Sequence, residues 1–242
     1  PSTHAAFSFP RDGVARAGRV GRALALALRS AGVRLLEDDG LRRVSLAGDR
    51  ASGVETTAGA LPADTVVLAG RTRPDRASGS PPLPLAVSSR TWMRLDAVSD
   101  PDRPTRLLAS RRARVVPRRD GSVIVAGPAS PGGAPTHPTG SEVSALLAEL
   151  ARLFPSSGSW GLVGAGSGRE ARAPDQLPLL GETGSPGLFA ATGWGPDELL
   201  LAPAAAAIVA DLLTGKRPPV SAASLAPGRS GAGPGGNGIL FG

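Results

Sequence analysis

The sequence predicts an α+β or mixed α/β protein. Three segments of apolar residues at helical spacing, near residues 17–31, 141–153 and 196–213, indicate helices. Short apolar or alternating runs that end at Gly, Asp or Pro lie between them and read as strands. With 242 residues and a hydrophobic fraction of 41%, the chain is long and apolar enough for one or two packed domains.

The N-terminal third reads as a helix, a strand, a β-meander and a buried strand. Val20, Leu24 and Leu28 recur at helical spacing over residues 17–31, which predicts a helix with one buried face. Gly32 follows as its C-cap. The strands expected here are residues 33–37, 41–47, 53–57 and 65–69.

The rest of the chain continues the alternation of helices and strands. Further strand-like runs occupy residues 83–87, 90–95, 113–117, 122–126, 160–165 and 187–192. Asp120-Gly121 separates two of them and predicts a hairpin turn. Ser141 is expected to cap a helix that runs to about Leu153, and another helix is expected over residues 196–213.

The strongly basic composition does not by itself indicate nucleic-acid binding. The formal charge is +7, but all of the 27 basic residues except Lys216 are arginine, as expected from a GC-rich genome. Five Phe, three Trp and no Tyr offer few platforms for stacking on bases. For the cluster Arg111, Arg112, Arg114, Arg118 and Arg119, a solvated face beside strands is favoured over a phosphate-binding site.

Several classes of protein are excluded by composition. The sequence has no cysteine, so disulfides, thiolate metal sites and a Cys nucleophile are excluded. The two histidines, His4 and His137, offer no His-rich metal site, and no metal is expected. No apolar run approaches the ~18 residues that a membrane span requires, so a cytoplasmic protein is expected.

One glycine-rich segment imitates a dinucleotide-binding loop. Gly164, Gly166 and Gly168 follow a strand-like run, as in loops that cradle phosphate. Such a loop needs a helix directly after it, and Pro174 and Pro178 leave no room for one. A flexible turn near a sheet edge is therefore the favoured interpretation.

Three stretches together carry a resemblance to a known family. They are residues 31–70, which end in Ala69-Gly70; residues 114–127, with the pattern Pro-Arg-x-Asp-Gly; and residues 173–215, with Pro174-Asp175 and Thr192-Gly193. In order and approximate spacing they resemble the C-terminal two-thirds of the FAD-dependent amino-acid and amine oxidases. That family includes D-amino-acid oxidase, sarcosine oxidase and the glycine oxidase of thiamine biosynthesis.

The resemblance implies a partial FAD-linked oxidoreductase fold with an antiparallel-sheet substrate domain. Residues 1–78 would form part of the FAD-binding domain, 79–167 the substrate domain, 168–215 a return to the FAD-binding domain, and 216–242 a flexible Gly/Pro-rich tail. The N-terminal βαβ unit that carries the family's flavin fingerprint is expected to be missing before Pro1. A partner chain would then supply it, or the protein would form a homo-oligomer.

The third stretch also has a physical interpretation of its own. A strand ending at Thr192 runs into Gly193-Trp194-Gly195-Pro196 and a helix, so a ligand could approach the backbone closely. Free N–H groups at a helix start favour negative charge, which in flavin oxidases is the edge of the reduced ring. An ordinary strand–turn–helix is the alternative. The resemblance implies FAD contacts at Leu41, Ala69, Gly70, Gly193, Trp194, Gly195, Pro196 and Leu199.

The family binds its substrate carboxylate with an arginine, through two parallel hydrogen bonds. Alignment puts Glu170 at that position, so Arg169 or Arg172 is the candidate, and a solvated arginine is the alternative for each. The implied reaction is oxidation of the C–N bond of a small amino acid or secondary amine, with hydride transfer to flavin and hydrolysis of the imine.

The sequence also departs from the family pattern. Trp194 stands where a histidine is customary, and Asp197-Glu198 replace Asn-Gly, which places like charge near a flavin anion. A degenerate, non-catalytic relative or partner subunit that has lost flavin binding is therefore the alternative function.

Overall fold

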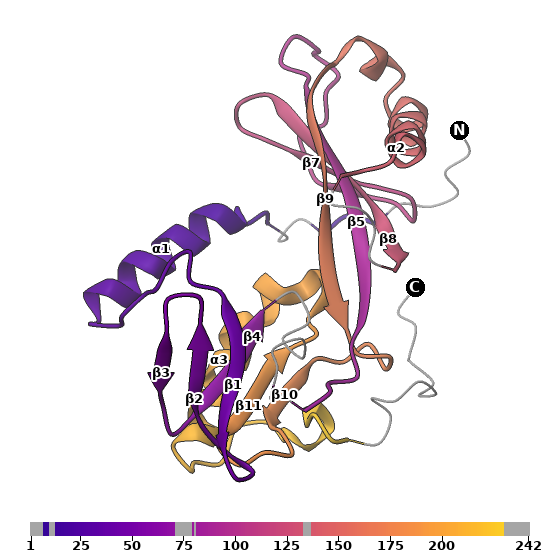
Figure 1. Ribbon diagram of the computed structural model, residues 1–242. Coiled ribbons are helices and arrows are strands. Elements are labelled where there is room, and N and C mark those ends of the chain that lie inside the picture. Colours follow the sequence, from indigo (N-terminus) through magenta and orange to yellow (C-terminus); the bar gives the residue numbers. More distant parts are fainter. Residues whose placement is uncertain (1–6, 10–12, 71–78, 80, 133–136, 230–242) are drawn as a thin grey trace. The chain divides into compact units, whose positions relative to one another are not determined.

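The computed structural model describes residues 7–9, 13–70, 79, 81–132 and 137–229 (Figure 1). The chain divides into two compact units, each made of two segments. The first unit comprises residues 1–23 and 88–169, and the second comprises residues 24–87 and 170–242. Because each unit joins segments that are far apart in the sequence, long-range contacts hold both cores together.

The first unit contains a five-stranded sheet in the order β6-β7-β8-β5-β9. Its strands are β5 (Ala86–Asp96), β6 (Leu108–Ala109), β7 (Arg114–Pro117), β8 (Ser122–Pro131) and β9 (Gly161–Arg172). β8 pairs antiparallel with both β5 and β7. The hairpin expected at Asp120-Gly121 is confirmed, and Gly121 has the positive φ, 83°, that its turn requires.

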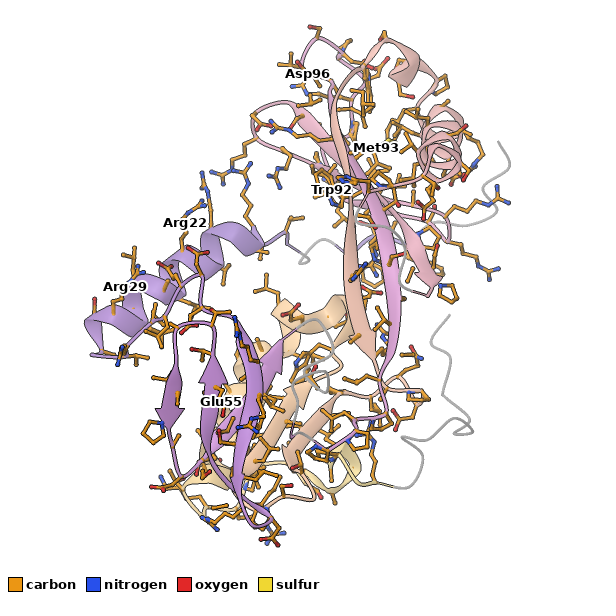
Figure 2. The ribbon with its side chains drawn as sticks, in the orientation of Figure 1. Arg22, Arg29, Glu55, Trp92, Met93 and Asp96 are labelled. Carbon is orange, nitrogen blue, oxygen red and sulfur yellow. The ribbon has the colours of Figure 1, made fainter. Side chains whose placement is uncertain are left out.

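Helix α2 (Gly140–Leu153) packs on this sheet and completes the core of the first unit. Neighbouring residues of a strand point to opposite faces. Met93 on β5 is accordingly 0% exposed while Trp92 is 40% exposed (Figure 2). A 3₁₀ helix, η2 (Pro155–Ser159), follows α2. The buried cluster comprises Met93, Leu95, Ala97, Ala113, Val115, Val123, Val125, Leu146, Leu150 and Trp160.

Two local predictions in the first unit are wrong. The N-cap of α2 is Thr139 rather than Ser141, because Thr139 and Glu142 form a reciprocal capping box. The segment from Gly164 to Gly168 lies inside β9 and is no flexible turn. Gly166 packs directly beneath the Trp92 ring, where a Cβ would lie 2.6 Å from Cζ2, so cross-strand packing explains this glycine.

The second unit contains two three-stranded sheets. The antiparallel meander β1-β2-β3 consists of β1 (Leu41–Ala47), β2 (Arg50–Thr56) and β3 (Ala60–Pro62). The other sheet, β10-β11-β4, consists of β10 (Leu179–Glu182), β11 (Leu188–Thr192) and β4 (Val66–Gly70). In this sheet β4 runs parallel to β11, and β10 runs antiparallel to it.

Apolar side chains pack the second unit into one body. Val44 and Ala51 of the meander meet Val66, Leu68 and Leu188 of the mixed sheet. Helix α3 (Glu198–Leu213) packs on the same mixed sheet through a cluster of Leu180, Ala205, Ile208 and Val209. The 3₁₀ helix η4 (Ala223–Leu225) adds Leu225 to that cluster, so residues up to 229 belong to the packed unit. The rest of the expected tail, 230–242, lies outside the described residues.

Near the N-terminus one prediction is partly right and one is wrong. Helix α1 (Ala17–Ser30) forms as predicted, with Gly32 after it at φ 79°, but none of its residues is buried. Leu24 and Leu28 of the expected buried face are 56% and 41% exposed, because burial needs a packing surface that periodicity cannot supply. Residues 33–37 form no strand.

The strand expected over residues 83–87 begins only at Ala86. Leu83 and Leu85 instead enter the core of the second unit. Their cluster also contains Ala171, Ala173, Leu179 and Ala190.

Candidate functional site

Two strands of the second unit end together where the cofactor contacts are expected. β4 and β11 are parallel, with Gly70 opposite Thr192 at their carboxyl ends. The Thr192 hydroxyl donates to the Gly70 carbonyl oxygen over 3.0 Å, and the Thr192 side chain is fully buried. In α/β sheets, ligands bind beyond the carboxyl ends of parallel strands. This edge is therefore the candidate functional site.

The chain leaves β11 through a turn that requires glycine at two positions. Gly193 has φ 78° and Gly195 has φ 57°, in the region that residues with a Cβ avoid. A Cβ on Gly193 would also lie 3.0 Å from Cδ2 of Leu85. The 3₁₀ helix η3 (Gly195–Asp197) then leads into α3. Within η3, Pro196 carries no N–H and the Asp197 N–H donates to the Trp194 carbonyl oxygen over 3.4 Å. What favours negative charge here is the positive end of the α3 dipole.

Arg172 lies against this glycine turn. Its backbone forms a β-bridge with Trp194. Its guanidinium covers Gly195 so closely that a Cβ there would overlap Nε and Nη2. Nη1 donates to Oε1 of Gln176 over 2.7 Å. A ligand that approached the turn backbone from this side would meet the Arg172 guanidinium, a donor suited to carboxylates.

The Trp194 ring serves packing at the turn. Its indole N–H donates to the Ala191 carbonyl oxygen over 3.0 Å, and the ring packs on the cluster beneath α3. The polar atom that could have met a ligand is therefore already used within β11. A hydrogen bond from Trp194 to a cofactor would therefore come from its backbone.

The other predicted residues occupy different places. Ala69 is exposed at the end of β4, and a Cβ on Gly70 would meet open space. Pro196 lies in η3 and Leu199 in the first turn of α3, where Leu199 is partly exposed. Leu41 begins β1 in the meander, so it lies in a different sheet from Gly70. Arg169 is exposed and belongs to the first unit, whereas Arg172 belongs to the second unit and lies against the turn.

Acidic residues share the vicinity of Arg172. Glu170, at the position where the family resemblance calls for arginine, is buried in the second unit. Asp197 ends η3 and is exposed, and Glu198 begins α3. A carboxylate at a helix start is stabilised by the helix dipole, yet it competes with an anionic ligand for the same N–H groups. Arg172 supplies positive charge at the turn despite these carboxylates.

Sequence reasoning missed Gln176, the residue that holds Arg172. Gln176 has φ 66°, a left-handed conformation rare for a residue with a side chain. Its amide accepts from Arg172 at 2.7 Å. The only sequence signal was its position directly after Pro174-Asp175, which marks a bend but not the conformation of the residue that follows.

The open strand end at Gly70 is the part of this site with room for the ring end of a flavin dinucleotide. The end of β4 is open, because a Cβ on Gly70 would meet no atom of the described residues within 4 Å, but Leu85 fills the space beside Gly193 and the Arg172 guanidinium fills that beside Gly195. A planar ring would therefore meet the open strand end at Gly70 and the Arg172 guanidinium rather than the two glycines. For the pyrophosphate half the fit fails within the described residues, because the run of three alternating glycines there is part of β9 and leads into no helix. The described part of the chain contains no cluster of three or more His, Asp or Glu that could hold a metal ion.

The fold is shared with solved amino-acid oxidases. Glycine oxidase from Geobacillus kaustophilus superposes with a TM-score of 0.76 at 26% identity, over 87% of this chain and 57% of that chain. A parallel strand pair, a glycine turn and a separate sheet with antiparallel pairing thus belong to the fold of a flavin-linked oxidoreductase. The sequence matches the family described as FAD dependent oxidoreductase over residues 1–212. The chain belongs to that family, as the resemblance predicted.

Curated relatives agree with this assignment. The Bifunctional protein ThiO/ThiG of Nostoc sp. is 31% identical over 207 residues, which cover 85% of this chain and 31% of that protein. The Glycine oxidase of Pseudomonas aeruginosa is 29% identical over 86% of this chain and 58% of that protein. The chain thus spans 31% to 58% of the length of these relatives. No helix among the described residues is long and apolar enough to cross a membrane.

Proposed function

We propose that this chain forms the C-terminal part of an FAD-dependent oxidoreductase that oxidises the C–N bond of a small amino acid or secondary amine, as a glycine oxidase does. The observation that carries the proposal is the Arg172 guanidinium held against the glycine turn at the end of β11. The start of α3 offers the positive end of a helix dipole to an anionic ring edge, and the arginine offers paired donors to a carboxylate. The family match and the glycine oxidase relatives support the same chemistry.

When bound, FAD supplies the acceptor for hydride from the carbon next to the substrate nitrogen, and the imine product is hydrolysed by water. The residues of this chain bind and orient. Arg172 pairs with the substrate carboxylate through two parallel N–H···O bonds and so fixes the position of the α-carbon. With FAD bound, the helix dipole at the start of α3 and the Arg172 guanidinium would stabilise negative charge on the flavin edge. Neither role needs a protein nucleophile or a strong base.

The proposal includes a further domain, beyond the two units described above, that holds the rest of FAD. Leu24 and Leu28 on α1 and Val67 on β4 are exposed, and among the described residues β4 is an edge strand paired in parallel on one side only. Parallel sheets are normally covered on both faces and rarely end at an exposed apolar edge. A βαβ unit from further sequence or from a partner chain would cover this surface. A cytoplasmic location and a small-molecule substrate complete the proposal.

Flavin binding is tested first. The purified chain, alone and with an added dinucleotide-binding unit of a glycine oxidase, is titrated with FAD and followed by flavin absorbance and by quenching of flavin fluorescence. Saturable uptake supports the proposal. A folded protein that stays colourless under both conditions would instead establish the non-catalytic relative.

Substrate identity and the role of Arg172 are tested next. Peroxide release and dye reduction are measured with glycine, sarcosine and D-amino acids. Arg172→Gln is expected to raise KM for carboxylate substrates by about 100-fold, because a charge-assisted bidentate pair is lost. The matched control is Arg169→Gln, at an exposed position within the same strand, and its KM is expected to stay near that of the unmodified chain. Equal increases in KM in the two variants would contradict the assignment of Arg172 as the carboxylate-binding residue.

A further inference from the structure

The bend after β9 holds Gln176 in a costly backbone conformation. Within the described residues, Gln176 and Asp38 are the non-glycine residues with positive φ. A left-handed backbone at a residue with a side chain persists only where its surroundings impose it. The question is therefore what imposes φ 66° on Gln176.

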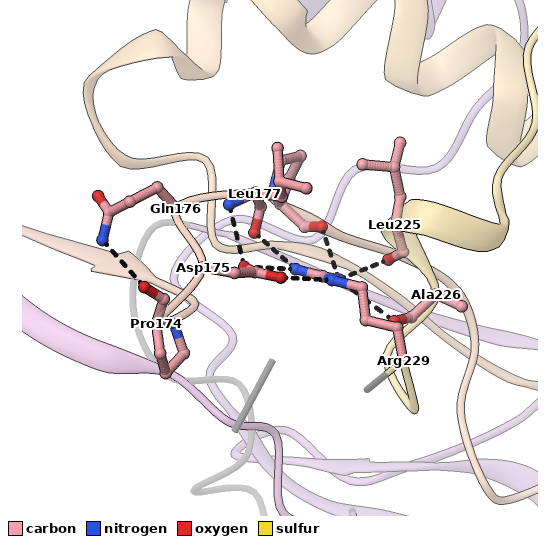
Figure 3. A network of polar contacts seen from close by, with 8 residues as sticks. Pro174, Asp175, Gln176, Leu177, Leu225, Ala226 and Arg229 are labelled. Carbon is pink, nitrogen blue, oxygen red and sulfur yellow. Dashed lines mark hydrogen bonds and ion pairs between the residues drawn. The ribbon is translucent and has the colours of Figure 1, made fainter. Parts of the chain in front are cut away.

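Arg229 bonds the chain on both sides of Gln176 (Figure 3). Its Nε and Nη2 each donate to one carboxylate oxygen of Asp175, both at 2.8 Å. Nη2 also donates to the Leu177 carbonyl oxygen at 3.0 Å, and Nη1 donates to that of Pro178 at 3.1 Å. The residues directly before and after Gln176 are thus tied to one rigid, planar guanidinium.

The same guanidinium anchors the C-terminal segment. Nη1 donates to the carbonyl oxygens of Leu225 and Ala226 at 3.0 and 3.2 Å. The side chains of Arg229 and Asp175 are only 7% and 14% exposed, so water does not compete strongly for these bonds. Hydrogen bonds from Arg229 hold the pKa of the Asp175 carboxyl below its usual range, which keeps the pair charged at neutral pH.

Gln176 transmits this constraint to the glycine turn. The amide oxygen of Gln176 accepts from Nη1 of Arg172 at 2.7 Å, and its amide nitrogen donates weakly to the Pro174 carbonyl oxygen at 3.4 Å. The remaining guanidinium nitrogens of Arg172 lie against Gly195. A long arginine side chain has many rotamers, and this one is held at its far end by Gln176.

We propose that Arg229 is a positioning residue for Arg172: together with Asp175 it locks Gln176 in the left-handed conformation from which Gln176 holds the Arg172 guanidinium over the glycine turn. The C-terminal segment therefore does more than close the fold. It orients the carboxylate-binding arginine. That Arg172 binds a carboxylate rests on the proposed function. The positioning of Arg172 by Gln176 and Arg229 is a property of the chain without ligand.

The test measures the accessibility of Arg172 directly. The full 242-residue chain is treated with phenylglyoxal, which modifies arginine, and modification of each arginine is followed by peptide mass spectrometry. Arg229→Gln and Gln176→Ala are each expected to raise the modification rate of Arg172 by about threefold or more, the factor that corresponds to one lost hydrogen bond. Arg217→Gln, an exposed arginine of the same C-terminal segment, is the control and should leave the rate unchanged.

A double-mutant cycle separates positioning from general loosening. If Arg229 acts through Gln176, Arg172 in the variant with both substitutions is modified no faster than in Gln176→Ala alone. Additive effects would show two independent routes and overturn the proposal. So would an unchanged rate in folded Gln176→Ala, whose exposed side chain makes loss of folding unexpected. If Arg229→Gln does not fold, Asp175→Asn replaces it under the same criteria.

Activity provides a separate readout. In flavin-loaded protein, Gln176→Ala is expected to raise KM about threefold or more with kcat within about twofold, because it removes binding rather than chemistry. A change in kcat alone would overturn the positioning role. Faster modification of Arg172 in a protein that oxidises no amine would leave the positioning network standing and refute the proposed function only.

Discussion

The hydrogen bond from Thr192 to Gly70 is expected to hold the two strand ends of the candidate site together. Thr192→Val replaces the hydroxyl by a methyl group of similar size, so little beyond the bond changes. Thr192 is fully buried, and its bond joins residues 122 positions apart in the sequence. Loss of a buried hydrogen bond that leaves its acceptor without that donor costs about 1–3 kcal/mol. We expect the second unit to lose about 2 kcal/mol, or about 4–8 °C in Tm.

The assay must report on the second unit alone. Of the three tryptophans, Trp194 lies in the second unit and Trp92 and Trp160 lie in the first. In a background with Trp92→Phe and Trp160→Phe, fluorescence during urea unfolding follows Trp194. The free energy of unfolding is then compared between this background and the same background carrying Thr192→Val.

The matched control makes the same chemical change at an exposed site. Thr214 donates to the Ala210 carbonyl oxygen at 2.8 Å at the end of α3, where water can replace the bond. Thr214→Val should therefore change the free energy of unfolding by less than about 0.5 kcal/mol. A Thr192→Val effect as small as that of the control would refute the reasoning that burial makes the Gly70 bond important.

Three further predictions concern the turn, the buried ion pair and the first core. Gly195→Ala is expected to displace the Arg172 guanidinium, because a Cβ would overlap it, and the rate of Arg172 modification measures this displacement. The same variant is expected to lose about 1–2 kcal/mol of stability in urea unfolding, because φ is 57° at this position. Because its folded pKa is lowered, Asp175 stabilises the fold above its unfolded pKa of about 3.9 and loses that contribution as pH falls through the folded pKa. Asp175→Asn should therefore weaken the acid dependence of stability below about pH 4, measured by urea unfolding across pH. Leu150→Ala should cost the first unit about 2–5 kcal/mol in urea unfolding, since Leu150 is 0% exposed.

Two of these predictions have a matched control variant, and all three have a defined contrary result. Gly215 has φ 68° with open space around it, so Gly215→Ala should cost stability without altering Arg172. Leu200 is 79% exposed, and Leu200→Ala should be nearly neutral. Equal rates of Arg172 modification in Gly195→Ala and Gly215→Ala would contradict the argument about the turn. An unchanged pH dependence of stability in Asp175→Asn would contradict the argument about the ion pair. Equal losses of stability in Leu150→Ala and Leu200→Ala would contradict the argument about the core.

Local patterns predicted most elements of this fold. Helical spacing of apolar residues predicted α1, α2 and α3, and the Asp120-Gly121 pair predicted the hairpin between β7 and β8. Predictions failed where long-range packing decided the outcome. The glycine-rich segment of β9 was expected to turn, but Gly166 is needed where the Trp92 ring crosses it. Periodicity also placed a buried face on α1, whereas none of its residues is buried.

For the candidate site, the sequence by itself determined the family, the glycine turn after Thr192 and the two arginines that merited attention. These follow from residue types and their spacing, which local conformation and resemblance both use. Only the tertiary structure identifies Arg172 as the arginine at the turn, because this depends on where a flexible side chain is held in space. The Asp175–Arg229 pair that holds it joins residues 54 positions apart, and no local pattern encodes such a contact.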